Sequence, residues 1–168
     1  QDNGSWISSG SNADKTKTYT FIYGGDGYEA LWHYNKPGDY LVTSQYGRVG
    51  RYQQNIYIGD ANIADSGNRS VAPFYSKLSS ADNNPDAVFI VTSRGVWRSV
   101  DFGANWNLTS ILTGFSSGNN SALNVEVSTA DPNVVWAGNA MRQDGSISLQ
   151  LSEDNGQTFT KVSSYTDP

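Results

Sequence analysis

The sequence contains one eight-residue pattern twice, and each copy follows a stretch rich in β-branched and apolar residues. The copies run from Ser99 to Trp106 and from Ser152 to Phe159, and both read Ser-x-Asp-x-Gly-x-x-Trp/Phe. Ser and Asp two residues apart can accept hydrogen bonds from nearby backbone N–H groups, and Gly supplies a conformation with positive φ. The aromatic residue three positions later can pack beneath the turn. The pattern therefore predicts two hairpin turns, each anchored by a buried aromatic side chain.

The two turns belong to a longer repeat, in which a proline-centred turn precedes each of three apolar strand patterns. These turns begin at Lys36, Asn84 and Asp131, at intervals of 48 and 47 residues. The aspartates of the eight-residue pattern are 53 residues apart, and extra residues at positions 139–145 explain the difference. In the first unit Gln54 stands where the aspartate is expected, so this copy has degenerated. A period of this size matches a four-stranded propeller blade.

The eight-residue pattern resembles the Asp-box, also called the BNR repeat, which marks β-propellers of the sialidase, sortilin and xyloglucanase type. With the proline turns and their strands, the resemblance covers most of residues 24–162. Over this range the sequence is similar to the sortilin-type or xyloglucanase-like propellers of large secreted bacterial proteins. In these families the Asp-box lies at the periphery, so the resemblance implies a structural role for the matching residues. They are Ser99, Asp101, Gly103, Trp106, Ser152, Asp154, Gly156 and Phe159.

We therefore predict an all-β fold of three consecutive four-stranded antiparallel propeller blades. Residues 1–16 are predicted to form a polar N-terminal loop or the tail of a preceding element. The blades are assigned to residues 17–69, with the degenerate Asp-box, to residues 70–117, and to residues 118–168, which end in a linker. Propellers usually close with at least four blades. We therefore expect the remaining blades in the same longer chain or in a partner subunit, and the first residue, Gln1, favours a processed or truncated start.

Strands are expected where β-branched and aromatic residues gather. In the first blade these stretches are residues 18–23, 28–34 and 40–45, and residues 48–54 return through a short turn. Residues 70–78 are expected to form the inner strand of the second blade.

Composition and charge limit the classes of function. The 168 residues carry a formal net charge of −5 and no run of Lys or Arg, which argues against nucleic-acid binding because phosphates require clustered cations. No apolar run reaches the length of a membrane span, and cysteine is absent. With few Lys and many Asn, Ser, Thr and Tyr, the composition suits a bacterial protein that is secreted or held at the cell surface.

We predict no cofactor and no metal ion. The polar loop at residues 60–68 contains two carboxylates, which could ligate Ca²⁺, but it lacks the Gly and terminal Glu spacing of a calcium loop.

Asp26 is the candidate catalytic residue, because it lies in a run of three glycines that would let the backbone approach a ligand. The resemblance to xyloglucanase-like enzymes implies two opposed carboxylates acting as acid and base around a sugar cleft. The sequence does not identify the second carboxylate, for which Glu29, Asp39 and Asp144 are available. The alternative is a Gly-rich bend that the Asp side chain caps.

Trp32, His33, Tyr46 and Arg48 are candidate ligand-binding residues, because aromatic rings stack on sugars and His titrates near neutral pH. Alternate residues of a strand point to opposite faces, so Trp32 and His33 are expected on different sides, and one of these faces can instead pack between blades. The arginines are scattered and there is one histidine. This argues against a sialidase site and a Ser-His-Asp triad.

The sequence is consistent with two functions. The first is a non-catalytic secreted or cell-surface propeller module that binds protein or glycan, or builds an extracellular scaffold. The second is a segment of a xyloglucanase-like glycoside hydrolase that acts on β-glucan through paired carboxylates.

Overall fold

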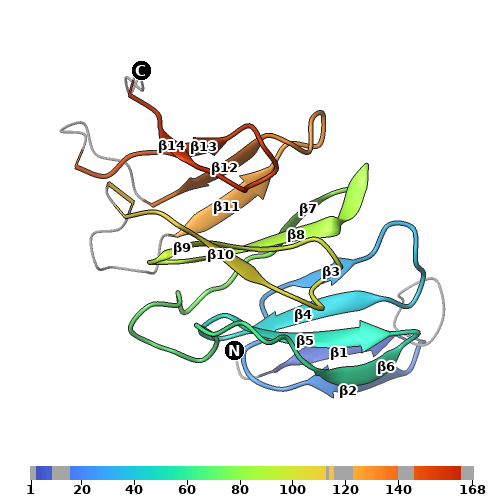
Figure 1. The fold of residues 1–168 in the computed structure, drawn as a ribbon. Coiled ribbons are helices and arrows are strands. Elements are labelled where there is room, and N and C mark those ends of the chain that lie inside the picture. The colour runs from blue at the N-terminus through green and yellow to red at the C-terminus, as the bar shows by residue number, and fades with distance from the viewer. Residues whose placement is uncertain (1–2, 9–15, 113, 116–122, 140–145, 164–168) are drawn as a thin grey trace.

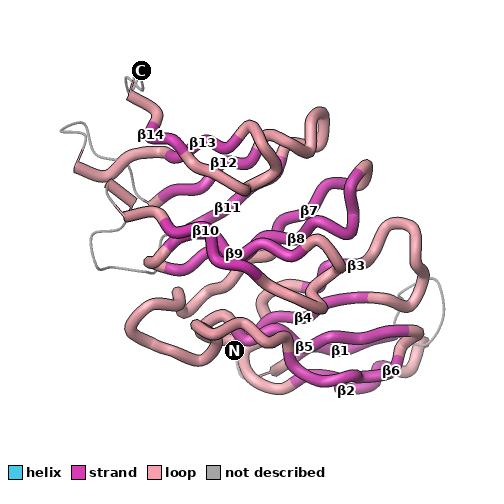
Figure 2. Tube along the Cα trace, viewed as in Figure 1, coloured by secondary structure: helices cyan, strands magenta, loops and turns pink. Residues whose placement is uncertain are grey.

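The computed structural model describes residues 3–8, 16–112, 114–115, 123–139 and 146–163, and these contain strands, turns and loops but no helix (Figures 1 and 2). The described residues therefore include no helix that could cross a membrane. In chain order the strands are β1 (Ser5–Ser8), β2 (Tyr19–Tyr23), β3 (Ala30–Trp32), β4 (Tyr40–Ser44), β5 (Arg48–Gln53), β6 (Ile56–Asp60), β7 (Ser79–Ala81), β8 (Asn84–Thr92), β9 (Gly95–Ser99), β10 (Asn107–Ser110), β11 (Asn124–Val127), β12 (Val135–Gly138), β13 (Gln150–Ser152) and β14 (Thr160–Lys161).

The strands from β3 onward form three four-stranded sheets in the orders β3-β4-β5-β6, β7-β8-β9-β10 and β11-β12-β13-β14. Each strand pairs antiparallel with its neighbour in the chain. This connectivity defines propeller blades, and the predicted all-β fold with three consecutive four-stranded blades is confirmed. We call the sheets blades 1, 2 and 3. They lie one after another in Figure 1.

The core lies between the blades, and strand β8 shows how one blade serves two interfaces. Along this strand Val88 and Ile90 join a cluster that includes Leu41 of blade 1, whereas Phe89 and Val91 join a cluster that includes Val125 of blade 3. The alternation follows from the period of two in a strand. Because both faces of β8 are buried, the strand has an almost continuous apolar sequence, and each fully buried side chain contributes roughly 1.5–3 kcal/mol.

A two-stranded hairpin covers the other side of blade 1. Among the described strands β2 pairs only with β1, and Ile7 and Ile22 pack against buried Tyr40 and Tyr52 of blade 1. The Tyr52 hydroxyl also donates a hydrogen bond of 2.6 Å to the carbonyl oxygen of Ile22. Within the stretch predicted as a loop or the tail of a preceding element, Ser5–Ser8 form strand β1. Residues 18–23, which the sequence assigns to the first blade, contain β2, and this strand pairs with β1 and not with the sheet β3-β4-β5-β6.

The inner strand of blade 2 also differs from the prediction. It is β7, Ser79–Ala81, and residues 70–78 contain turns and bends instead of a strand. Two backbone N–H groups, of Val71 and Ala72, donate to the carbonyl oxygen of Asn68. These N–H groups therefore bond within the loop and not to a neighbouring strand. Pro73 has no N–H that could pair with a strand.

The antiparallel order places successive connections at opposite ends of each blade. One end, which we call the loop face, carries residues 24–29, 45–47 and 61–78. The opposite end, which we call the turn end, carries the turns after β3, β5 and β9 in blades 1 and 2, and both eight-residue patterns lie at this end. The candidate site residues are therefore divided between two ends of the molecule.

Candidate functional site

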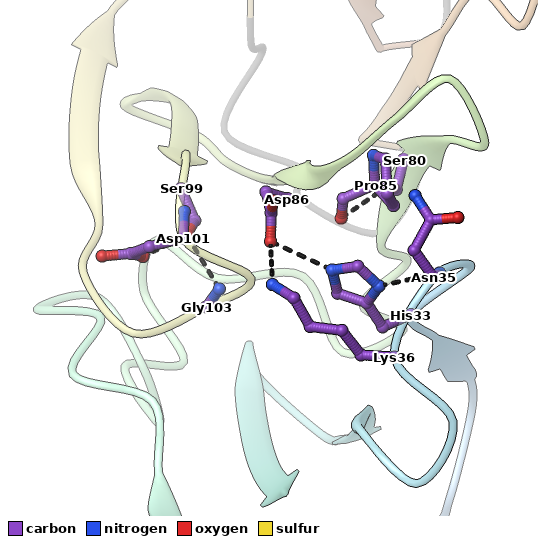
Figure 3. Close-up of polar contacts among 9 residues, drawn as sticks. All are labelled: His33, Asn35, Lys36, Ser80, Pro85, Asp86, Ser99, Asp101 and Gly103. Atoms are coloured by element: carbon purple, nitrogen blue, oxygen red, sulfur yellow. Dashed lines mark hydrogen bonds and ion pairs between the residues drawn. The ribbon is translucent and has the colours of Figure 1, made fainter.

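The eight-residue patterns at the turn end use their polar side chains on their own backbone. Ser99 Oγ accepts hydrogen bonds from the N–H groups of Gly103 at 2.8 Å and Asp101 at 3.2 Å (Figure 3). Gly103 has a φ of 80°, and the indole N–H of buried Trp106 donates 3.0 Å to the Gly103 carbonyl oxygen. Burial alone would raise the pKa of Asp101, but hydrogen bonds from Asn105 lower it. These groups hold the turn together.

The second copy has the same hydrogen bonds, with Ser152 Oγ accepting the Gly156 N–H at 2.8 Å. Hydrogen bonds from the Thr158 side chain and backbone lower the pKa of Asp154 to about 2. This turn also attaches blade 3 to blade 2, because Arg98 donates through Nη2 to Asn155 Oδ1 at 2.7 Å. The turn is thus part of the interface between the two blades.

In blade 1 a two-residue turn replaces the eight-residue pattern. Gln54 and Asn55 have φ values of 50° and 65°, as in the type I′ hairpins that match the twist of paired strands. The Gln54 N–H donates 3.0 Å to Asp39 Oδ1. Asp39 is therefore at the turn end, away from Asp26.

His33 joins blade 1 to blade 2 and is almost completely buried, with 4% of its surface exposed. Its Nε2 lies 3.0 Å from Asp86 Oδ1, and Lys36 Nζ reaches the same oxygen at 2.7 Å (Figure 3). Its Nδ1 accepts the N–H of Asn35 at 3.1 Å, so in the neutral ring Nε2 carries the proton. The ring also packs edge-on against Phe102, 4.6 Å between centroids. We therefore leave His33 out of the proposed ligand site.

Trp32 lies on the opposite side of blade 1 from His33, as the alternation of a strand requires. Its ring is 52% exposed and lies 4.4 Å from that of Tyr40, which is stacked on Tyr52 at 4.5 Å. Trp32 thus belongs to the aromatic side of blade 1 that the β1-β2 hairpin partly covers, and it is not grouped with Tyr46.

The loop face brings Asp26 and Tyr46 close together through Gln45. The Asp26 N–H donates 3.2 Å to Gln45 Oε1, and the Tyr28 hydroxyl donates 2.9 Å to Asp26 Oδ2. The glycines are needed here, because a Cβ on Gly25 would lie 2.4 Å from the Gln45 side chain and its φ is 88°. The link before β3 is therefore held against the turn between β4 and β5.

Four aromatic side chains meet on this face, and we call Tyr28, Tyr46, Phe74 and Tyr75 the aromatic cluster. The Tyr28 ring lies 5.7 Å from Phe74 and 5.0 Å from Tyr75, and Tyr46 lies 5.3 Å from Phe74, in edge-to-face contacts. Backbone bonds fix the arrangement, since the Tyr46 N–H donates to the Phe74 carbonyl oxygen. Phe74 and Tyr75 are 43% and 47% exposed. The cluster therefore presents aromatic surface to solvent.

A pocket of about 270 Å³ lies beside the cluster, lined by Gln45, Tyr46, Arg48, Gly67, Arg69 and Phe74. Arg69 lies over the Tyr46 ring, 5.0 Å from its centroid. The ion pairs of the described residues involve neither Arg48 nor Arg69. The site thus combines aromatic surface, an amide and two guanidinium groups, which are the chemical groups of a small-molecule binding site.

The predicted site residues are thus only partly assembled. Asp26, Tyr46 and Arg48 lie on the loop face, whereas Trp32 and His33 do not. The sequence patterns did not indicate Tyr28, Gln45, Arg69, Phe74 and Tyr75 as site residues. The one available signal in the sequence is the adjacent pair Phe74 and Tyr75. The apolar and aromatic residues of the surrounding stretch, residues 70–78, favour a strand instead of a site.

Of the three carboxylates that the sequence offers as partners for Asp26, the structure describes Glu29 and Asp39. Glu29 accepts the Leu78 N–H at 2.7 Å, and burial raises the pKa of its carboxyl. Asp39 lies at the turn end, and Asp144 lies outside the described residues. Glycoside hydrolysis requires a carboxylate pair across the scissile bond, and the identity of a second carboxylate for Asp26 stays open.

Both carboxylates at residues 60–68 accept hydrogen bonds from protein groups. Asp65 is completely buried, pairs with Arg94, and accepts hydrogen bonds of 2.9 Å from Thr92 and from the Trp97 indole. Asp60 accepts the hydroxyl of Tyr57 at 2.7 Å, and this hydrogen bond and burial raise the pKa of Tyr57 to about 12. In the described ranges no three His, Asp or Glu residues gather in a way that could hold a metal ion.

A second pocket, of about 320 Å³, lies on the side of blade 3 that faces away from blade 2. Its lining includes Trp136 and Leu149. The neighbouring residues Val135 and Ala137 point toward blade 2. This is the surface on which a following blade would pack in a propeller.

The fold is shared with solved propeller enzymes. The GH74 xyloglucanase from Xanthomonas campestris matches with a TM-score of 0.61 and 17% identity over 85% of this chain and 22% of its own. A GH74 enzyme from Niastella koreensis matches with a TM-score of 0.58 and 16% identity, again over 85% of this chain and 22% of its own. An ancestral GH74 enzyme matches with a TM-score of 0.56 and 13% identity over 82% of this chain and 18% of its own.

These matches show the β-propeller fold, and this chain spans about a fifth of the length of each matched structure. No protein-family model matches the chain, and no curated protein does. The class that the structure defines is therefore a β-propeller fold with three four-stranded blades.

Proposed function

We propose that this chain is a non-catalytic segment of a larger extracellular β-propeller and that it binds a glycan on its loop face. The observation that carries the proposal is the aromatic cluster, in which Phe74 and Tyr75 are exposed beside a pocket with polar groups. Soluble proteins seldom expose contiguous apolar surface without a binding role. Aromatic rings offer flat apolar faces to the C–H faces of sugars, and the amide of Gln45 and the guanidinium groups can bond to hydroxyls.

The two open sides of the blade stack support the larger propeller. Trp32 and Tyr34 are exposed on blade 1, and the pocket at Trp136 lies on the free side of blade 3. Further blades, from the same longer chain or from a partner subunit, would cover these sides. In this proposal the eight-residue turns are Asp-boxes of a sortilin-type or xyloglucanase-like propeller, and they serve the packing between blades.

A second candidate is a segment of a xyloglucanase-like glycoside hydrolase. It is favoured by the fold of the GH74 enzymes and by the position of Asp26 on the same face as the aromatic cluster. In this case another part of the propeller would supply the opposed carboxylate.

Calorimetric titration of the full chain with a panel of neutral and acidic β-linked oligosaccharides tests the proposal. We expect at least one oligosaccharide to bind and Phe74→Ala to weaken this binding by tenfold or more. Tyr34→Ala is the matched control, because it removes an exposed aromatic side chain at the turn end. If no oligosaccharide binds, or if Phe74→Ala binds as well as the unmodified chain, the loop face is not a glycan site.

The same oligosaccharides separate the two candidates. Release of new reducing ends that stops in Asp26→Asn would establish hydrolysis and replace the non-catalytic proposal. Binding without release of reducing ends supports the non-catalytic proposal.

A further inference from the structure

We infer that the loop-face pocket binds an acidic sugar unit, whose carboxylate or sulfate is held between Arg48 and Arg69. The inference rests on the proposed glycan-binding function and specifies the class of ligand. It depends on the position of the two guanidinium groups, on their lack of counter-ions among the described residues and on the size of the pocket.

Each guanidinium group lies beside another residue that lines the pocket. Arg69 lies over the Tyr46 ring, which favours the cation by its quadrupole and fixes one face of the group. The Arg48 side chain lies beside Gly67. A Cβ placed on that glycine would be in van der Waals contact with Arg48 Nε, at 3.6 Å. The Gly67 N–H in turn donates 2.7 Å to the Tyr46 carbonyl oxygen. Both guanidinium groups therefore lie near the same stretch of backbone around Tyr46 and Gly67.

The charge of this pocket is opposite to that of the whole chain. The formal net charge is −5, and yet two of the six lining residues are arginines. The ion pairs of the described residues use the cations Lys36, Lys77 and Arg94, and His33 also bonds to Asp86. Three carboxylates on the same face are engaged by other groups, since Asp26 accepts the Tyr28 hydroxyl, Glu29 accepts the Leu78 N–H and Asp65 pairs with Arg94. The two arginines thus keep donor capacity for a ligand.

The size and chemistry of the pocket favour one acidic sugar unit over other anions. A volume of about 270 Å³ is near the lower end of ligand pockets, roughly 300–1,000 Å³. Guanidinium groups form planar forks that match carboxylate and sulfate oxygens in bidentate pairs. Phe74 and Tyr46, on the rim, can contact the sugar ring. Two arginines are too few for a nucleic-acid surface, which needs a larger basic patch.

The test is a calorimetric titration of the full chain with three β-linked oligosaccharides of equal length: a neutral one, one containing glucuronate and one carrying a sulfate ester. We expect one or both acidic oligosaccharides to bind at least tenfold more tightly than the neutral one, with a preference that declines as salt is raised. Comparison of the glucuronate and sulfate forms identifies which anion the pocket selects.

Variants connect the preference to the pocket. Arg48→Gln and Arg69→Gln should each reduce the affinity for the preferred acidic oligosaccharide about tenfold and leave that for the neutral one within about twofold, because a charge-assisted bond is worth more than a neutral one. Lys161→Gln is the control, since it removes one positive charge from the exposed end strand of blade 3.

The outcomes distinguish the inference from the function on which it rests. Equal affinity for the three oligosaccharides, or an acidic preference that survives both arginine substitutions, overturns the acidic-sugar inference and leaves glycan binding intact. Absence of binding by all three contradicts both.

Discussion

The imidazole Nε2 of His33 lies 3.0 Å from the carboxylate Oδ1 of Asp86, although the two residues belong to different blades and are separated by 53 positions in the chain. Lys36 bonds to the same carboxylate oxygen. This contact joins the turn after β3 to the start of β8, beneath the buried apolar cluster between blades 1 and 2 (Figure 3). Because Asp86 accepts both donors, the contact fixes the position of one blade against the next.

Removal of the imidazole should destabilise the stack of blades. We expect His33→Ala to lower the free energy of unfolding by about 2 kcal/mol, because it breaks a hydrogen bond to a charged group and leaves a cavity against Phe102. Urea unfolding followed by tyrosine and tryptophan fluorescence measures this loss. Asp86→Asn should lower the free energy of unfolding less in the His33→Ala variant than in the unmodified chain, since the two residues share one contact. Fully additive losses would show that His33 and Asp86 act independently.

The turn at Asp154 should contribute to the loss of stability in acid. Its carboxyl has a pKa lowered to about 2 in the folded chain, chiefly by hydrogen bonds from Thr158. A lowered folded-state pKa stabilises the fold at pH above the unfolded-state value, roughly 3.9. This contribution is lost progressively as the pH falls toward 2. Asp154→Asn should therefore flatten the decline of stability between about pH 4 and pH 2, and an unchanged profile in thermal melts across this interval would contradict the prediction.

The two aromatic anchors should differ in their effect on stability. Trp106 is buried and donates its indole N–H within the turn, so Trp106→Ala should cost about 3–5 kcal/mol. Phe159 is only partly buried, so Phe159→Ala should lower the free energy of unfolding by a smaller amount. Chemical unfolding of both variants gives the comparison. A larger loss for Phe159→Ala than for Trp106→Ala would show that the second turn carries more of the packing than its burial indicates.

The parts of the fold that the sequence predicts are those specified locally. The hydrogen bonds around Ser99 and Gly103 involve residues at most four positions apart, so a spacing pattern contains all of the information. The proline-containing repeat precedes or begins the second strand of each sheet, although Pro85 lies within β8 and not in the predicted turn. The pairing of β1 with β2 is harder to predict because it depends on an apolar pair, Trp6 and Ile7, in an otherwise polar stretch.

The candidate site is also hard to predict, because its residues come from three separate connections. Tyr46 and Phe74 meet only when the turn after β4 and the link before β7 reach the same end of the blade. No spacing between them indicates this contact. The contact of His33 with Asp86 is equally hidden in the sequence, because the two residues are far apart in the chain and belong to different blades.

A pH series should separate the binding site from the contacts that hold the blades. The arginines of the loop-face pocket stay charged across ordinary pH values, and an acidic sugar loses its charge only below about pH 4. We therefore expect affinity for the preferred acidic oligosaccharide to be constant from pH 8 to pH 5 in calorimetric titrations. A marked change of affinity within this interval would point to a titrating group that the loop-face pocket does not contain.

The loop face around Tyr46 is proposed as the glycan-binding surface, and the most direct test is to map the bound ligand on the chain. Amide chemical shifts of the ¹⁵N-labelled protein would be followed during titration with the oligosaccharide that binds most tightly. We expect the shifts to concentrate at residues 24–28, 45–48 and 66–75, with the turn end unaffected. Shifts centred on Trp32 or Trp136, with none on the loop face, would contradict the proposal.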